Sequence, residues 1–213
     1  MIPGALLRTI TPPGAFAALL ADTGQTLKPH PGEALLMAHA VAKRQREFAL
    51  GRACARAALA RLGHGKAALG RKADGAPLWP DGIVGSISHT QTHAVALAAP
   101  AEAFRGLGVD VEQEGRVTPA LYRHLFDSEE RAQLAGMPEA GRHTLAALLF
   151  SAKEACCKIW LTRHEASQPF TGIHVTMTGM DFTAQFPARG YVPLRGRAGF
   201  GGSMVLAAAW DAV

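Results

Sequence analysis

Residues 142–164 read RHTLAALLFSAKEACCKIWLTRH, and this segment decides the fold class. At about 100° per residue, a helix built from it has one continuous apolar face. That face consists of Leu145, Leu148, Leu149, Ala152, Cys156, Ile159 and Trp160. Glu154 lies opposite the apolar face, and Lys158 lies one turn beyond Glu154. The pattern predicts a long helix that packs on a core and carries charged groups on another side.

A second long helical segment lies in the first half of the chain. It runs from about Glu33 to Leu62, with room for one break, and stops at Gly63, a residue type that commonly ends helices. Each long helix leads to an alanine-rich strand, VALAA at 95–99 and VLAAA at 205–209. This echo predicts an α+β fold of two similar halves, a pseudo-dimer with the active site in the cleft between them. We expect the halves to span residues 1–105 and 106–213.

Shorter segments complete the expected order of elements. Residues 1–32 are rich in proline and glycine and are expected to wrap the surface, and residues 65–82 are expected to form a loop. Strands are expected at 83–87, 93–98 and 107–112, with more strands between 170 and 210 that end in 204–210. Helices are expected at 119–125 and 128–134, the second with Ser128 as its N-cap.

Composition limits the class of protein. The chain has 213 residues, of which 48% are hydrophobic and 18% charged, as in globular domains. No apolar run approaches the roughly 20 residues of a membrane span, and the N-terminal segment predicts no signal peptide. Three cysteines with no Cys-x-x-Cys spacing favour a reducing cytoplasm over a disulfide framework or zinc site. The net charge of +5 favours an anionic partner: nucleic acid, a phosphate-rich cofactor or an acidic protein.

The strongest chemical signal is Gly108-Val109-Asp110-Val111-Glu112. On a strand, Asp110 and Glu112 point to the same face, where two carboxylates repel each other unless a cation or a shared proton relieves them. Such hard oxygen ligands suit Mg²⁺, which often also binds substrate phosphates. Taken alone, the pattern favours an ordinary strand with one solvated face.

Three further segments carry groups that can bind anions or take part in chemistry. Glu154 and Lys158 are i, i+4 neighbours, which alone predicts a surface ion pair. An arginine cluster lies at helical spacing and can clamp a phosphate or form a solvated basic face; it comprises Arg44, Arg46, Arg52 and Arg56. Gly85-Ser86-Ile87-Ser88-His89 ends a strand, where a histidine can contact phosphate or serve the structure.

Together these segments resemble, in order and spacing, the 4'-phosphopantetheinyl transferase family of the larger, surfactin-synthetase type. The likeness is strongest to its enterobactin-synthase and mycobacterial-type branches and covers residues 43–158. The matching elements are Lys43-Arg44-x-x-Glu47-Phe48, Gly51-Arg52-x-Cys54-Ala55-Arg56, Pro77-x-Trp79-Pro80, Gly85-Ser86-Ile87-Ser88-His89, Gly108-Val109-Asp110-Val111-Glu112 and Phe150-Ser151-Ala152-Lys153-Glu154. The last two, at this separation, are the most specific.

The resemblance implies an enzyme that moves the phosphopantetheine arm of coenzyme A to a serine of an apo acyl or peptidyl carrier protein, using Mg²⁺. It implies that the metal ligands are Asp110, Glu112 and Glu154. It implies that coenzyme A contacts Arg44, Arg52, Ser88, His89, Asp110, Lys153, Glu154 and Lys158. Glu154 is the expected general base, with Glu112 second, and Lys158 is expected to stabilise the leaving group.

Two positions depart from the family pattern. Many relatives have Gly-Lys-Pro where this chain has Gly75-Ala76-Pro77, and Arg71 or Lys72 is expected to supply the missing charge. Phe150 replaces a frequent tryptophan. Because both halves lie in one chain, we expect a monomer. The basic charge favours an acidic carrier, and the resemblance implies a helical carrier protein of fatty-acid, polyketide or nonribosomal-peptide synthesis.

Two other functions compete with this interpretation. A different Mg²⁺-dependent phosphoryl transferase is possible, although the sequence lacks the Gly-x-x-x-x-Gly-Lys-Ser/Thr loop of P-loop enzymes. A nucleic-acid-binding module would need aromatic residues on a basic face, yet aromatic residues make up only 7% of the chain. We therefore expect no nucleic acid and no membrane among the partners.

Overall fold

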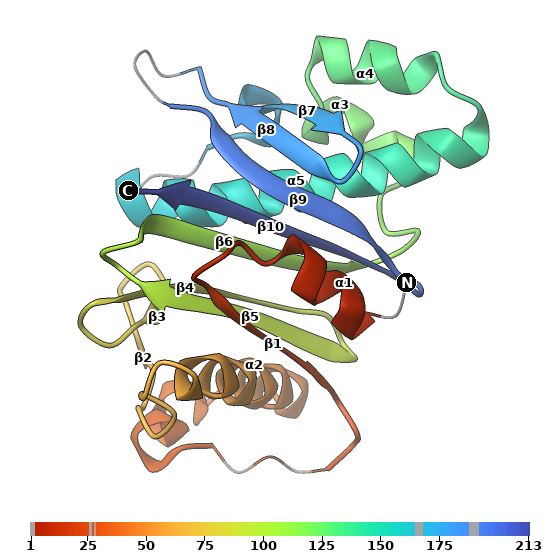
Figure 1. Ribbon diagram of the computed structural model, residues 1–213. Coiled ribbons are helices and arrows are strands. Elements are labelled where there is room, and N and C mark those ends of the chain that lie inside the picture. Colours follow the sequence, from red (N-terminus) through yellow and green to blue (C-terminus); the bar gives the residue numbers. More distant parts are fainter. Residues whose placement is uncertain (1–2, 26, 28, 165–167, 188–191) are drawn as a thin grey trace.

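A computed structural model describes residues 3–25, 27, 29–164, 168–187 and 192–213 (Figure 1). One antiparallel sheet has the order β1-β5-β4, and a second has the order β6-β10-β9-β8-β7. Their strands are β1 (Phe16–Ala21), β4 (Ile83–His89), β5 (His93–Pro100), β6 (Phe104–Gln113), β7 (His174–Thr178), β8 (Asp181–Gln185), β9 (Leu194–Gly201) and β10 (Met204–Ala212). A short hairpin pairs β2 (Gly70–Arg71) with β3 (Pro77–Leu78).

The helices are short except for two. The α-helices are α1 (Pro3–Ile10), α2 (Ala42–Ala60), α3 (Tyr122–Leu125), α4 (Ser128–Ala135) and α5 (Glu139–His164). The 3₁₀ helices are η1 (Pro31–Met37), η2 (Pro119–Leu121) and η3 (Phe170–Gly172). No helix among the described residues is long and apolar enough to cross a membrane.

The two halves repeat one topology, which confirms the α+β prediction. In the first half the order β1, α2, β4, β5 gives a sheet with β5 in the middle; in the second, β6, α5, β9, β10 places β10 between β6 and β9. The hairpin β7–β8 extends only the second sheet. The central strands are the two alanine-rich segments in which the sequence shows its echo.

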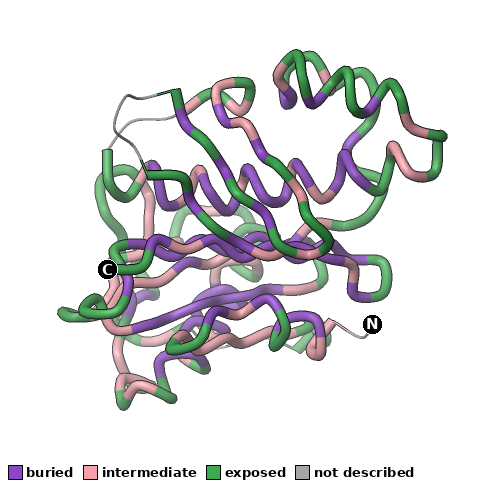
Figure 2. Tube along the Cα trace, turned by 45° about the horizontal axis from the view of Figure 1, so that its top comes forward, coloured by how far each residue is buried: buried purple, intermediate pink, exposed green. Residues whose placement is uncertain are grey.

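The fold is layered as helix, sheet, sheet, helix. Val95, Leu97 and Ala99 of β5 share a core with residues of β6 and β10, while the alternate residues of β5 face α2. The inward positions of β10 likewise divide between that central core and the α5 layer. Because alanine side chains are small, both long helices can approach their sheets closely. Buried residues follow the strands and the long helix in Figure 2.

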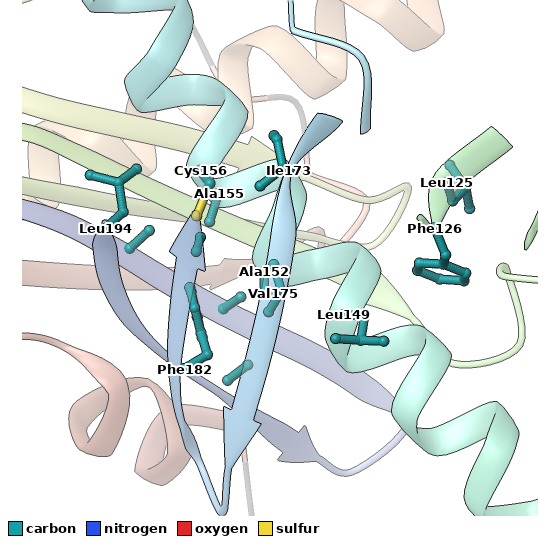
Figure 3. Packing of buried hydrophobic residues seen from close by; sticks show 14 of the residues in the cluster. Leu125, Phe126, Leu149, Ala152, Ala155, Cys156, Ile173, Val175, Phe182 and Leu194 are labelled. Carbon is teal, nitrogen blue, oxygen red and sulfur yellow. The ribbon is translucent and has the colours of Figure 1, made fainter. Parts of the chain in front are cut away.

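The predicted apolar face of α5 forms the largest core cluster. Its members pack on Val175 of β7, Phe182 of β8 and Leu194 of β9, as Figure 3 shows. Leu149, Ala152, Cys156 and Ile159 are fully buried there. Leu148 is only half-buried and packs at the margin of the cluster.

Two sequence predictions were wrong, and a third was confirmed. Residues 1–32 contain α1 and β1 instead of only surface loop, because Leu6, Leu7 and Ile10 of α1 are buried against β9 and β10. The helical stretch expected from residue 33 contains the one break that the sequence allowed, and this break divides it into η1 and α2. Asp127, not Ser128, caps α4: its carboxylate accepts hydrogen bonds from the backbone N–H groups of Glu129 and Glu130.

Candidate active site

Two glycines let α5 lie directly against β6. A Cβ atom added to Gly108 would lie 1.9 Å from the carbonyl oxygen of Ala155, and one added to Gly106 would lie 2.8 Å from the side chain of Ile159. Glycine in a strand often marks such a close backbone approach. The glycines therefore bring the inner face of α5 next to the carboxylates that follow them on β6.

Asp110 lies where the two halves meet, and it is only 2% exposed. Ser88 of β4 donates a hydrogen bond to its Oδ1 atom at 2.8 Å, and Ser151 of α5 donates to Oδ2 at 2.9 Å. Lys158 Nζ lies 3.0 Å from Oδ1 and donates to the carbonyl oxygen of Val109 at 2.7 Å. The carboxylate of Asp110 on β6 thus contacts β4 of the first half and α5 of the second half.

Glu112 and Glu154 stand beside Asp110. Burial raises the pKa of Glu112, and Asp110 and then Glu154 raise it further. Burial likewise raises the pKa of Glu154, with Asp110 as the next cause and Lys158 acting in the opposite direction. Three mutually repelling carboxylates therefore share one site and create a demand for positive charge.

The donor set fits a hard divalent cation. Glu112 Oε2 is buried without a hydrogen bond among the described residues, although Arg116 Nη1 lies 3.3 Å away. Carboxylate oxygens are the ligands that Mg²⁺ prefers. The acids are spaced more widely than one compact trio elsewhere in the described chain, whose ligand atoms all lie within 4.8 Å of one another.

The raised pKa of Glu154 predicts a pH-dependent gain in stability for Glu154→Gln in metal-free protein. Ionising this carboxyl costs free energy only in the folded chain, because the folded pKa exceeds the ordinary value of 4.5. The cost is full above the raised pKa and vanishes as the pH falls below 4.5. The variant should therefore have a higher Tm than wild type above neutral pH, and the difference should shrink on acidification.

Thermal unfolding over a pH series in a chelating buffer measures this difference. Exposed Glu102 provides the matched control, and Glu102→Gln should show no such trend. A lower Tm for Glu154→Gln above neutral pH would contradict the assigned repulsion.

A basic pocket of about 140 Å³ opens between α2 and the end of β4. Four predicted cofactor residues line it: Arg44, Arg52, Arg71 and His89. Arg44 Nη1 lies 3.4 Å from Nε2 of His89. Burial lowers the pKa of His89, which Arg44 and Lys158 also lower against the influence of Glu47, so the imidazole is neutral near pH 7.

Arg52 is almost buried in the wall of this pocket. Its guanidinium lies over the Phe48 ring, 4.6 Å from the centroid, and Nη2 donates to the carbonyl oxygen of Gly70 at 3.0 Å. Its Nε atom is buried with no hydrogen-bond partner among the described residues. Arginine stays protonated in proteins, so this wall keeps a positive charge that an anion can balance.

A larger pocket of about 520 Å³ adjoins the basic one, and Gly75 and Ile87 line both. Its walls come from residues 74–87 of the first half and from β6 and α5 of the second half. Lys158 lines it, and so does Lys72. The sequence could not decide whether Arg71 or Lys72 supplies the missing charge. The two residues line different pockets: Arg71 the basic one and Lys72 the larger one.

Lys153 does not reach this cleft. Its side chain is fully buried on another side of α5, where it pairs with Glu130 and donates to the carbonyl oxygens of Leu125 and Phe170, each at 2.9 Å. The expectation that Lys153 contacts coenzyme A conflicts with this position, because adjacent helix residues point about 100° apart. Glu130 belongs to the compact trio with Asp127 and His174.

Each member of the trio of Asp127, Glu130 and His174 has a hydrogen-bond or ion-pair partner within the protein. Asp127 caps α4 and contacts His174 Nδ1 at 2.7 Å, while Lys153 balances Glu130. Arg56 forms an ion pair away from the acid cluster: its Nη1 atom donates hydrogen bonds to both carboxylate oxygens of Glu33, at 2.7 and 2.8 Å. Neither group belongs to the acid cluster at Asp110.

Sequence reasoning missed two residues that shape the site. Ser151 lies inside the quoted motif, but only the fold shows that its hydroxyl reaches Asp110. Glu33 is a fully buried carboxylate that joins Arg56 of α2 to the backbone N–H of Leu69, just before Arg71. The residues next to Glu33 in the sequence give no indication of its contacts with Arg56 and Leu69, which are remote in the chain.

Comparisons with known proteins give matches over both halves of the chain. The family model described as the 4'-phosphopantetheinyl transferase N-terminal domain matches residues 32–99, and that of the 4'-phosphopantetheinyl transferase superfamily matches residues 106–187. The chain is 36% identical over 179 residues to the 4'-phosphopantetheinyl transferase Npt of Nocardia iowensis, covering 84% of this chain and 80% of Npt. It is 33% identical over 191 residues to PptT of Mycobacterium tuberculosis, covering 89% and 83% of the two chains.

More distant matches cover less of the molecule. Enterobactin synthase component D of Salmonella typhi is 36% identical over 126 residues, covering 57% of this chain and 50% of that protein. A solved structure of Thermotoga maritima holo-[acyl-carrier-protein] synthase matches with a TM-score of 0.42 and 17% identity, covering 51% of this chain and 63% of that one.

Proposed function

The chain belongs to the 4'-phosphopantetheinyl transferase family, and from this premise we propose how its cleft works. The enzyme transfers the 4'-phosphopantetheine arm of coenzyme A to a serine of an apo carrier protein. The observation that carries the proposed site is the junction at Asp110. There Lys158 and the serines of both halves converge on one carboxylate, beside two further acids and two adjoining pockets.

We assign the basic pocket to the 3'-phosphate of coenzyme A. The support is the convergence of Arg44, Arg52, Arg71 and His89 on one small cavity, with a buried, incompletely paired guanidinium in its wall. Arginine is well shaped for phosphate. Arg71 lines this pocket, whereas Lys72 lines the larger one, so we propose that Arg71 replaces the lysine of the Gly-Lys-Pro pattern and that Lys72 lies nearer the pyrophosphate or the pantetheine arm.

Arg52→Ala should raise the KM for coenzyme A more than it lowers kcat. The 3'-phosphate is remote from the reacting phosphorus, so its contacts are equally strong in the ground and transition states. Steady-state kinetics with coenzyme A and 3'-dephospho-coenzyme A measure the effect: wild type should prefer the full cofactor, and the variant should lose much of that preference. Arg61→Ala, at an exposed arginine that ends α2, is the control. An unchanged preference in Arg52→Ala would move the phosphate site elsewhere.

We propose that Asp110, Glu112 and Glu154 hold Mg²⁺. When bound, the ion supplies positive charge that neutralises the acids and the pyrophosphate of coenzyme A. Ser88 holds Oδ1 of the Asp110 carboxylate, and Lys158 contributes a second positive charge beside the same oxygen. Lys158 lines the larger pocket as well, which suits contact with the pyrophosphate.

The chain's own residues then move one proton and stabilise one leaving group. The serine oxygen of the carrier attacks the β-phosphorus, and the bond from that phosphorus to the bridging oxygen of 3',5'-ADP breaks. Glu154 accepts the serine proton, with Glu112 as the second candidate. The ammonium of Lys158 stabilises the charge that develops on the departing 3',5'-ADP.

The proposal also covers the oligomeric state, the cellular location and the charge of the carrier. Residues of both halves line the larger pocket, which supports a monomer divided near residues 105 and 106, although α1 packs across on β9 and β10. The three unpaired cysteines support a cytoplasmic location. The net charge of +5 supports an acidic carrier.

A thermal-shift experiment separates this function from its competitors. Coenzyme A with Mg²⁺ should raise the Tm, and 3'-dephospho-coenzyme A with Mg²⁺ should raise it less. An oligonucleotide without coenzyme A should have no effect. Stabilisation by the oligonucleotide but not by coenzyme A would favour the nucleic-acid-binding alternative, and stabilisation by a nucleoside triphosphate alone would favour another phosphoryl transferase.

A further inference from the structure

We infer that Ser151 is a positioning residue for the metal site: its buried hydroxyl fixes the orientation in which Asp110 meets the divalent cation. The inference rests on the proposed role of Asp110 and assigns the serine of the motif a function of its own. Ser151 is fully buried and lines neither of the two pockets, so it cannot contact either substrate there. Its hydroxyl donates to Oδ2 of Asp110 at 2.9 Å, and we assign its effect on the reaction to this contact.

The hydroxyl of Ser151 behaves differently from other hydroxyls on the same helix. Serine and threonine inside helices commonly donate to the carbonyl oxygen four residues earlier. Thr144 does so to Ala140 at 3.0 Å, and Thr162 does so to Lys158 at 2.8 Å. The recorded partner of Ser151 is instead a side chain on β6. Its hydrogen bond therefore connects the helix that carries Glu154 to the strand that carries Asp110.

The two serines divide the carboxylate of Asp110 between them. Ser88 of the first half holds Oδ1, and Ser151 of the second half holds Oδ2. The terminal torsion of an aspartate is broad when nothing restrains it, so a bond to each oxygen is needed to fix the plane of the carboxylate. Without Ser151, Oδ2 loses its recorded donor, and the plane can rotate about the Ser88 and Lys158 contacts on Oδ1. Hydrogen bonds that orient a ligand in this way change metal affinity by roughly 10–100-fold.

Calorimetric titration of Mg²⁺ into enzyme loaded with coenzyme A, with no carrier present, tests the inference. Ser151→Ala should raise the Kd for Mg²⁺ about tenfold or more. Ser151→Cys, a weaker donor of similar size, should fall between Ser151→Ala and wild type. Thr144→Ala removes an exposed hydroxyl that bonds only within the same helix, and it should leave the Kd unchanged. Raising Mg²⁺ should recover transfer activity in both Ser151 variants.

The outcomes separate positioning from simple structural support. Circular dichroism and Tm report folding for each variant, and Ser151→Cys keeps the test decisive where Ser151→Ala unfolds. A folded Ser151 variant that binds Mg²⁺ as tightly as wild type would overturn the inference, even with a lowered Tm. Wild-type enzyme that neither binds Mg²⁺ nor modifies any carrier would overturn the proposed function itself. Active wild-type enzyme together with a Ser151 variant of unchanged Mg²⁺ affinity would overturn only the role of Ser151.

Discussion

Replacing Asp110 with alanine should lower the rate of phosphopantetheine transfer ~10²-fold or more, the scale expected when a key charge-stabilising group is removed. The remaining activity should no longer depend on Mg²⁺. Asp110 receives hydrogen bonds or charge from Ser88, Ser151 and Lys158, so its loss removes the one carboxylate that these three groups share. Saturating Mg²⁺ should not restore the rate, because the ligand itself is missing.

Initial rates over a Mg²⁺ series, with 3',5'-ADP release as the readout, measure this effect. Asp110→Asn keeps the size of the side chain. Its amide oxygen can accept a hydrogen bond from one serine and its amide N–H can donate to the hydroxyl of the other, so the variant separates loss of charge from loss of structure. It should also lose most activity. Glu102→Ala, at an exposed acid in the turn before β6, should behave as wild type. Wild-type turnover by Asp110→Ala at saturating Mg²⁺ would show that the metal binds elsewhere.

Gly108→Ala should damage both stability and activity through a single methyl group. The added carbon would lie 1.9 Å from the carbonyl oxygen of Ala155, and backbone cannot swing aside as a flexible side chain can. Overpacking of a core typically costs 1–3 kcal/mol, and this contact should cost about 3 kcal/mol or more. The substitution forces α5 away from β6, so Glu154 and Lys158 lose their relation to Asp110.

Two other glycines calibrate this prediction. A Cβ on Gly106 would meet the side chain of Ile159, which can adjust, so Gly106→Ala should cost less. A Cβ on Gly4 of α1 would meet nothing within 4 Å, so Gly4→Ala should leave stability unchanged or slightly increased. Denaturant unfolding and transfer rates give both readouts. A Gly108→Ala protein with wild-type stability and turnover would contradict the close contact between helix and strand.

The sequence predicted the repeated architecture because its signal is periodic. The apolar face of α5 and the two alanine-rich strands follow patterns that one segment contains by itself. The helix α1 was missed because its apolar residues are few and lie between prolines, and only its packing on β9 and β10 explains its burial. Short elements depend on partners that are remote in sequence, and these leave no local pattern.

The predicted site residues also divide into those that a local pattern could place and those that only contacts in the fold could place. Asp110 and Glu112 are two apart on a strand, so their common face could be inferred from spacing alone. Lys153 and Glu154 are adjacent in one motif, yet the helix turns the lysine into a buried ion pair with Glu130. Arg71 and Lys72 likewise line different pockets because one residue changes the direction of the side chain.

Intact-mass spectrometry of apo carrier proteins incubated with this enzyme, coenzyme A and Mg²⁺ tests the central claim most directly. A panel of acyl and peptidyl carriers should include at least one that gains the mass of a single phosphopantetheine group on its serine, with release of 3',5'-ADP. The gain should disappear with a chelator, and with the Asp110→Ala variant. Folded enzyme that binds coenzyme A but adds no mass to any carrier in the panel would contradict the claim.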